Sequence, residues 1–247
     1  MKITPLFLAS AALLTTACNA EKGATNSSGP EVTTAPVLAP NDGDWSTLVT
    51  RTPEGGFLMG NPNAKVKLVE FGSMTCPHCA EFEEQGGKAL IDNYVKKGLV
   101  SWEYRNFVRD PLDMTATLLA RCGGEATFFG MTRALFHDQN GWIGRVQAAD
   151  PAEIQALQTM APAQRFSTIA DLAGLRTFVA QRGVPQAKAD QCLANRAEID
   201  KLVQMNSDAI SDYSIPGAPS FLINGTPPAF SANWPTLETR IKAALAS

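Results

Sequence analysis

The chain has 247 residues, of which 45% are hydrophobic and 18% are charged, and its formal net charge at pH 7 is −3. This composition is ordinary for a globular protein, and an acidic chain without a basic stripe is not suited to binding nucleic acid. Beyond residue 43, about 200 residues remain, which is enough for one domain, with or without an insertion.

The N-terminus has the pattern of a bacterial export signal. Lys2 precedes an apolar run over residues 6–14, which is too short to span a membrane stably, and small residues follow it. Cys18 predicts a lipoprotein-type cleavage site, although Thr15 stands where such sites usually have leucine. Ordinary cleavage near Ala20 is the alternative. Both routes predict a periplasmic location, and the first adds a lipid anchor at Cys18.

The next segment, residues 19–43, is rich in Ser, Thr, Gly, Ala and Pro. It has too few large apolar side chains to offset the entropy lost on ordering, so we expect a disordered tether after the signal, which we assign to residues 1–18.

The elements that follow predict a strand-helix-strand unit. We expect a first strand over residues 46–51, a buried strand over 65–71, a helix over 77–97 and a strand over 99–107. Gly98 is expected to end the helix. Because a helix separates the last two strands, they should be parallel and joined by a right-handed crossover.

From Asp110 to residue 213 the pattern is helical. Three helix starts combine a capping side chain with a first-turn proline or glutamate, at Asp110-Pro111, Asp150-Pro151 and Asn195-Arg196. In the last helix one apolar face is expected from Ile199, Leu202, Val203, Ala209 and Ile210.

The C-terminal part predicts more strand and one helix. A strand is expected over residues 220–223, a hairpin turn at Asn224-Gly225, an edge strand near 228–230 and a closing helix over 234–245. We therefore assign residues 44–109 and 214–247 to one α/β domain and residues 110–213 to a helical insertion within it.

The sequence Cys76-Pro77-His78-Cys79 follows directly on the expected buried strand. A cysteine at a helix start lies beside free backbone N–H groups and the positive end of the helix dipole, which favour the thiolate. Pro77 suits the first helical turn. His78 is expected to donate a hydrogen bond or positive charge to the thiolate, which would stabilise the reduced form and make the disulfide an oxidant.

Three other interpretations of the two cysteines compete with redox chemistry. A zinc site needs two more ligands, and the only other histidine is His137, so no metal is expected. Haem attachment needs histidine directly after the second cysteine, where Ala80 stands. A short structural disulfide would need neither a helix start nor His78.

The motif resembles the active site of the DsbA-like thiol:disulfide oxidoreductases of the thioredoxin superfamily, a class known for the low pKa of its active-site thiol. Glu70 lies six residues before Cys76, where that superfamily often places a buried carboxylate. The segment IPGAPSFLING at residues 215–225 resembles its cis-proline loop. The resemblance, over about residues 45–247, implies a thioredoxin-like fold with an inserted helical subdomain.

The resemblance assigns roles to individual residues. Cys76, nearest the helix start and expected to be the more exposed of the two sulfurs, would be the one that substrates attack, and Cys79 its buried partner, with Glu70 as a proton relay for Cys79. A partly exposed Glu70 without a role is the alternative. Pro219 would be the cis-proline facing the disulfide, and Ala218, where the family more often has Thr or Val, would dock the substrate backbone.

The implied activity is the introduction of disulfides into exported, cysteine-containing proteins. It would need no bound cofactor, and a membrane quinone-linked partner would reoxidise the dithiol. A disulfide isomerase or reductase served by a thiol reductant is the nearest rival. A module that binds unfolded clients, with redox chemistry secondary, is an alternative of another class.

Cys122 and Cys192 lie in the helical insertion. With Cys76 and Cys79 occupied and Cys18 in the export signal, they are the remaining partners for each other. We predict a structural disulfide between them, with two buried free thiols as the alternative.

Overall fold

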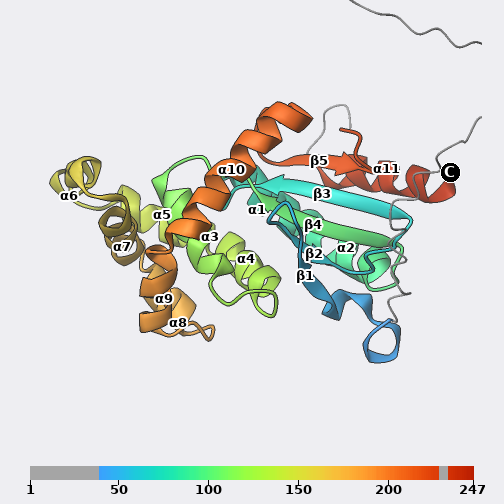
Figure 1. Ribbon diagram of the computed structural model, residues 1–247, viewed down its shortest axis with the longest axis horizontal. Helices are drawn as coiled ribbons and strands as arrows, with labels where there is room; N and C mark the ends of the chain where they lie inside the picture. Colours follow the sequence, from blue (N-terminus) through green and yellow to red (C-terminus); the bar gives the residue numbers. More distant parts are fainter. Residues whose placement is uncertain (1–38, 228–232) are drawn as a thin grey trace, which may run out of the picture. The chain divides into compact units, whose positions relative to one another are not determined.

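The computed structural model describes residues 39–227 and 233–247 (Figure 1). The export signal with Cys18, the tether up to residue 38 and the edge strand expected near 228–230 lie outside these residues. At the end of the expected tether, Asn41–Gly43 forms a short 3-10 turn, η1. Within the described residues, no helix combines the length and apolar character needed to cross a bilayer.

The described residues contain a five-stranded sheet with the order β1-β2-β4-β3-β5. Its strands are β1 (Val49–Arg51), β2 (Phe57–Met59), β3 (Val66–Gly72), β4 (Val100–Asn106) and β5 (Ser220–Ile223). The central pair, β3 and β4, is parallel, and Glu70 is paired with Tyr104. The other pairings are antiparallel. The expected strand-helix-strand unit is therefore the centre of the sheet.

The N-terminal edge of the sheet differs from the sequence-based expectation. Residues Trp45–Thr47 form a 3-10 turn, η2, because the Asp44 carboxylate accepts hydrogen bonds from the backbone N–H and hydroxyl of Ser46. The first strand is consequently limited to β1. Strand β2, which was not predicted, pairs with β1 and β4 and is only three residues long, too short to show an alternating pattern.

The helix after the Cys76–Cys79 motif runs without a break through α1 (Pro77–Phe82), η3 (Glu83–Gly87), α2 (Lys88–Leu90) and η4 (Ile91–Val95), and η3 and η4 are π-helical. Gly98, with φ of 71°, follows it as expected. Gly86 has a packing role, because a Cβ atom there would lie 2.7 Å from the Trp234 ring of helix α11 (Trp234–Ala246). The absence of a side chain lets the two helices approach closely.

The two faces of the sheet have different partners. On the face that carries Glu70 and Tyr104, aromatic contacts join Phe82 of α1 to Phe221 of β5, at 4.7 Å between ring centroids, and Trp102 of β4 to Phe129, at 5.1 Å. The other face packs against helix α10 through a smaller cluster made up of Phe71, Ala209, Ile215 and Leu222. The dithiol helix and α10 therefore lie on opposite sides of the sheet.

The chain between β4 and β5 is helical, as expected (Figure 1). Its elements are α3 (Pro111–Arg121), α4 (Phe128–His137), α5 (Gln139–Gln147), α6 (Pro151–Ala156), η5 (Leu157–Thr159), α7 (Pro162–Leu172), α8 (Leu175–Ala180), α9 (Gln186–Leu193) and α10 (Arg196–Tyr213). The three predicted caps form: Asp110, Asp150 and Asn195 each accept a backbone N–H of the first turn through the side chain.

The apolar face expected for α10 is only partly correct. Leu202 and Ala209 are buried, but Val203 is 58% and Ile210 57% exposed. Successive residues of a helix point about 100° apart. Because Leu202 and Ala209 point to the protein interior, Val203 and Ile210, one position further along, point to solvent.

Candidate active site

Cys76 is the N-cap of helix α1, with an extended backbone (φ −83°, ψ 119°), and Pro77 occupies the first turn. The carbonyl of Cys76 accepts the backbone N–H groups of Cys79 at 3.1 Å and Ala80 at 3.3 Å, which start the helix. The proline lacks an N–H at a position where none is needed, so the sequence defines the helix start one residue after the first sulfur.

The pKa of the Cys76 thiol is lowered from 9.0 to about 6. The largest cause is the hydrogen bond that the Cys79 thiol donates to it, followed by the opposing effect of burial, and then by the backbone N–H groups of Cys79 and His78 and the charge of Arg109. Both cysteines are buried, and Cys76, at 2% exposure against 0% for Cys79, is the more exposed of the two, as expected.

The pKa of the Cys79 thiol is raised well above 9.0, chiefly because burial disfavours its charged form. The hydrogen bond given to Cys76 and the charge of Glu70 raise it further, and the Ser73 N–H, 3.5 Å from the Cys79 sulfur, acts weakly in the opposite direction. The two thiols thus differ strongly in acidity although they are one helical turn apart.

The side chain of His78 does not act as predicted. It points into solvent, 74% exposed, and its Nδ1 lies 3.3 Å from the Glu81 carboxylate. What His78 contributes to the Cys76 sulfur is its backbone N–H. The correction follows from helix geometry, because residues three apart share a helix face, so Glu81 is the natural neighbour of His78.

Glu70 lies under the dithiol in the centre of the sheet and is 1% exposed, so the partly exposed alternative is wrong. Its Oε2 accepts a hydrogen bond from Trp102 Nε1 at 3.0 Å. Burial raises its pKa well above 4.5, and the nearby Glu83 adds to the effect. The charge of Glu70 raises the pKa of Cys79, and the charge of Cys76 raises the pKa of Glu70, so this side of the site favours the neutral forms.

The loop that precedes β5 closes the site from the opposite side. The peptide bond between Ala218 and Pro219 is cis, as the sequence resemblance implied. The Cys76 thiol lies 3.1 Å from the carbonyl oxygen of Ala218. Residues more than a hundred positions apart thus meet at the sulfur.

Four residues that the sequence analysis did not single out hold the loop before Cys76. Ser73 belongs to this loop, and Arg109, Asp113 and Gln139 connect the loop to the junction of β4 with α3 and to the start of α5. The cap at Asp110 predicts the helix that carries Asp113, but nothing in the sequence distinguishes a first-turn aspartate that is buried from one that faces solvent.

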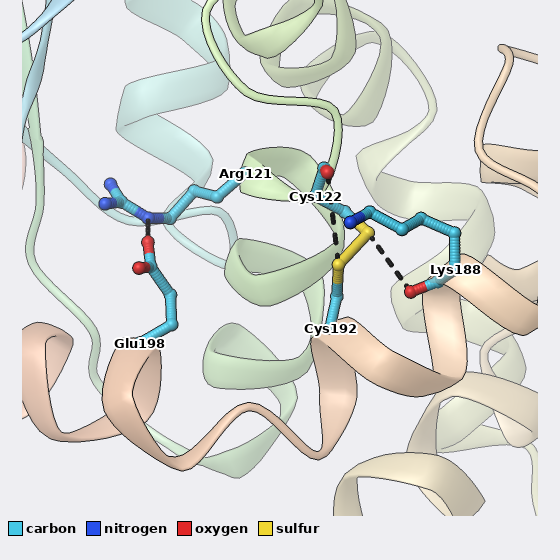
Figure 2. The surroundings of a disulfide bond; sticks show 5 residues. All are labelled: Arg121, Cys122, Lys188, Cys192 and Glu198. Atoms are coloured by element: carbon cyan, nitrogen blue, oxygen red, sulfur yellow. Dashed lines mark hydrogen bonds and ion pairs between the residues drawn. A yellow bond between two sulfur atoms is a disulfide. The ribbon is translucent and has the colours of Figure 1, made fainter.

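The other predicted cysteine pair lies in the helical insertion. Cys122, directly after α3, and Cys192 of α9 form a disulfide with an S–S distance of 2.06 Å and a Cα–Cα distance of 5.7 Å (Figure 2). Beside it, Arg121 pairs with Glu198 of α10 at 2.6 Å. The bond therefore fastens α3 to α9 where α10 also meets α3. Within the part of the chain that the structure describes, no group of three or more His, Cys, Asp or Glu is arranged to hold a metal ion.

A dithiol at a helix start, a buried carboxylate beneath it and a cis-proline loop opposite define a thioredoxin-type redox centre. The family model described as Thioredoxin matches residues 52–243. A solved protein-disulfide isomerase from Novosphingobium aromaticivorans is 38% identical, with a TM-score of 0.73 over 77% of this chain and 97% of that one. Alpha-DsbA1 from Wolbachia pipientis, 20% identical, has the same fold (TM-score 0.64 over 79% of this chain and 94% of that one).

Among curated proteins, one assigned as a protein-disulfide oxidoreductase in Rickettsia bellii is 25% identical over 70% of this chain. The match spans 58% of that relative's own length. The chain belongs to the thioredoxin family, and it is similar to proteins named as protein-disulfide oxidoreductases and as a protein-disulfide isomerase.

Proposed function

We propose that the protein is an exported oxidoreductase that introduces disulfides into other exported proteins through Cys76 and Cys79. The observation that carries the proposal is the contrast between the thiols: the pKa of Cys76 is lowered to about 6, whereas that of Cys79 is raised. A thiolate stabilised in the reduced form makes the corresponding disulfide more oxidising.

The reaction starts from the disulfide between Cys76 and Cys79. A substrate thiolate attacks the Cys76 sulfur, the bond to Cys79 breaks, and Cys79 leaves with the electron pair and takes up a proton. A second substrate thiolate then attacks the substrate sulfur of the mixed disulfide, and Cys76 leaves as a thiolate. The substrate loses two electrons and gains a disulfide, and the enzyme ends as a dithiol.

Glu70 is proposed as the proton relay for Cys79. A sulfur whose pKa is raised by burial cannot leave easily as a bare thiolate, so a proton donor beside it speeds its departure. Glu70 is buried at this position and keeps its proton well above pH 4.5. In the reverse direction the same carboxylate would accept the proton when the dithiol is reoxidised.

The cis-proline loop is proposed as the substrate-docking element. The Ala218 carbonyl lies beside the Cys76 sulfur and Pro219 follows it, so a backbone segment bearing the attacking cysteine can pair with this loop in an extended conformation.

The location and partners follow from the N-terminal sequence and the family. The protein is proposed to act in the periplasm, delivered by the export signal and, in the lipoprotein case, held to the membrane through Cys18. A membrane quinone-linked protein is proposed to reoxidise the dithiol. Labelling with a radioactive fatty acid, compared between the natural chain and Cys18→Ser, tests the anchor.

A disulfide isomerase is the second candidate, because the Novosphingobium aromaticivorans relative carries that name. An isomerase works from the dithiol form and rearranges substrate disulfides without net oxidation.

Two ribonuclease substrates separate the candidates. With reduced, unfolded ribonuclease, the stoichiometric oxidised protein is expected to remove two substrate thiols for each Cys76–Cys79 disulfide consumed. With scrambled ribonuclease, the reduced protein is expected to restore little activity. Efficient unscrambling with poor thiol oxidation would assign the protein as an isomerase instead.

A further inference from the structure

The loop of residues 73–76, which leads from β3 into the dithiol helix, is held by side chains from outside the strand and helix it connects. Ser73, Met74, Thr75 and Cys76 are all buried. Their polar groups are hydrogen-bonded to three residues that we call the loop-anchoring residues: Arg109, Asp113 and Gln139.

Asp113, in the first turn of α3, is fully buried and binds both the loop and Arg109. Its Oδ2 accepts the Ser73 hydroxyl at 2.6 Å and the Arg109 backbone N–H at 2.9 Å, and its Oδ1 accepts the Met74 backbone N–H at 2.9 Å. Ser73 is also the residue whose backbone N–H points at the Cys79 sulfur. A single carboxylate thus joins the loop to the residue that precedes α3.

Arg109 and Gln139 hold the rest of the loop. The Arg109 Nη2 donates to the Thr75 carbonyl at 2.9 Å and to its hydroxyl at 3.0 Å. The Gln139 amide, at the start of α5, donates to the carbonyls of Met74 at 2.8 Å and Cys76 at 3.0 Å. The backbone groups of Met74 and Thr75 that these residues engage belong to buried residues, so losing a partner would remove the hydrogen bond that each of these groups makes.

We propose that Arg109, Asp113 and Gln139 are positioning residues through which the helical insertion and its junction with β4 hold Cys76 in its reactive geometry. The Cys76 sulfur depends on backbone N–H groups of the first helical turn and on the Arg109 charge. Both conditions require the loop to stay in place. This inference rests on the proposed redox role of Cys76, and it adds that the insertion sets the reactivity of the thiol.

The test measures the acidity of Cys76 in the reduced, full-length protein from the ultraviolet absorbance of the thiolate, together with the alkylation rate, as a function of pH. Asp113→Asn keeps the size of the side chain, but an amide N–H₂ group replaces one carboxylate oxygen. This group is a hydrogen-bond donor and would face a loop group that is itself a donor. Arg109→Gln removes the cation from an exposed residue. Each change is expected to raise the Cys76 pKa by about one unit and to slow alkylation near neutral pH.

Two further variants separate positioning from general destabilisation. Arg109→Lys keeps a cationic donor and should restore most of the acidity. Glu103→Gln removes a different buried carboxylate, which binds Arg105 at 2.8 Å and 2.9 Å on the opposite face of the sheet, and should lower stability without moving the Cys76 titration. If Asp113→Asn does not fold, the comparison of Arg109→Gln with Arg109→Lys tests the proposal by itself.

The outcomes distinguish this inference from the proposed function. A natural chain whose Cys76 titrates at an ordinary thiol pKa would overturn both. A natural chain with an acidic Cys76, together with Asp113→Asn and Arg109→Gln variants that titrate identically to it, would overturn the loop-anchoring role alone.

Discussion

The Cys76 sulfur and the Ala218 carbonyl oxygen are 3.1 Å apart, although 142 positions separate the two residues in the chain. The contact joins the start of the dithiol helix to the cis-proline loop before β5. When Cys76 is protonated, its thiol donates to this carbonyl, so a backbone acceptor already occupies the position next to the sulfur. A substrate backbone that pairs with the loop would meet the sulfur at the same place.

The order of the two sulfurs can be tested by trapping. Cys79→Ala leaves Cys76 free to form a mixed disulfide that no second enzyme thiol can release, so complexes with substrate proteins should accumulate. Cys76→Ala should trap few, because Cys79 is fully buried and its pKa is raised. Non-reducing electrophoresis of both variants from cells makes the comparison. The reverse pattern would show that Cys79 is the sulfur attacked by substrates.

The ionisation of Cys76 makes the stability of the reduced protein depend on pH. The folded pKa of about 6 is below the ordinary value of 9.0. The folded state therefore releases this proton first, and the contribution is fully present above pH 9, shrinks below it and is lost as pH falls through 6.

In the oxidised protein Cys76 does not titrate. The free energy of unfolding of the reduced form, relative to the oxidised form, should therefore rise between about pH 6 and pH 9. Denaturant unfolding of both forms over this range measures the difference. A difference that does not change with pH would contradict an acidic Cys76.

Glu70 should have the opposite effect on how the free energy of unfolding depends on pH. Because its folded pKa is raised above 4.5, the folded state holds the proton longer than the unfolded chain, and stability declines as pH rises through this window. Glu70→Gln removes the titration and can still accept the hydrogen bond from Trp102. In the oxidised form the variant should gain stability relative to the natural chain as pH rises above 4.5.

The same Glu70 substitution should slow thiol exchange near neutral pH, because the proton donor for Cys79 is lost. Stopped-flow measurement of the reaction with glutathione, over the same pH range, provides the comparison. Unchanged rates at every pH would assign Glu70 a structural role only.

Tyr104 provides a test of the packing beneath the site. Its hydroxyl is buried and, among the residues that the structure describes, has no hydrogen-bond partner; a Cβ atom added at the nearby Gly72 would lie 2.2 Å from it. Tyr104→Phe should leave the free energy of unfolding unchanged or raise it by about 1 kcal/mol, since an unsatisfied buried hydroxyl is removed. Tyr94→Phe is the matched control, because Tyr94 donates to Glu238 at 2.8 Å, and it should cost about 1 kcal/mol. Equal losses in the two variants would show that Tyr104 has a partner.

The sequence predicted the parts of the site that depend on local pattern. A cysteine before proline at a helix start, a glutamate on a buried strand and a cis-proline loop all have signatures within a few residues. The side-chain directions could not be predicted. His78 turns to Glu81 because of helix geometry, and the burial of Cys76 depends on contacts from elements far away in the chain.

The fold could be predicted from the sequence to a similar extent as the site. Caps at Asp110, Asp150 and Asn195 fixed helix starts, whereas the three-residue strand β2 has no pattern of its own and exists through pairing with β4. The loop-anchoring residues belong to the same class of missed features. Asp113 and Gln139 are ordinary polar residues in sequence, and only the packing of α3 and α5 against the loop buries them.

The central claim is that the Cys76–Cys79 pair donates disulfides, and its redox equilibrium with glutathione tests it most directly. The protein without its export signal is equilibrated with a series of reduced and oxidised glutathione mixtures, and the free thiols are alkylated and assigned by mass, with Cys122 and Cys192 followed separately. The account predicts a reduction potential well above that of the glutathione pool. A low potential like that of thioredoxin would contradict it, and would show that the protein reduces disulfides.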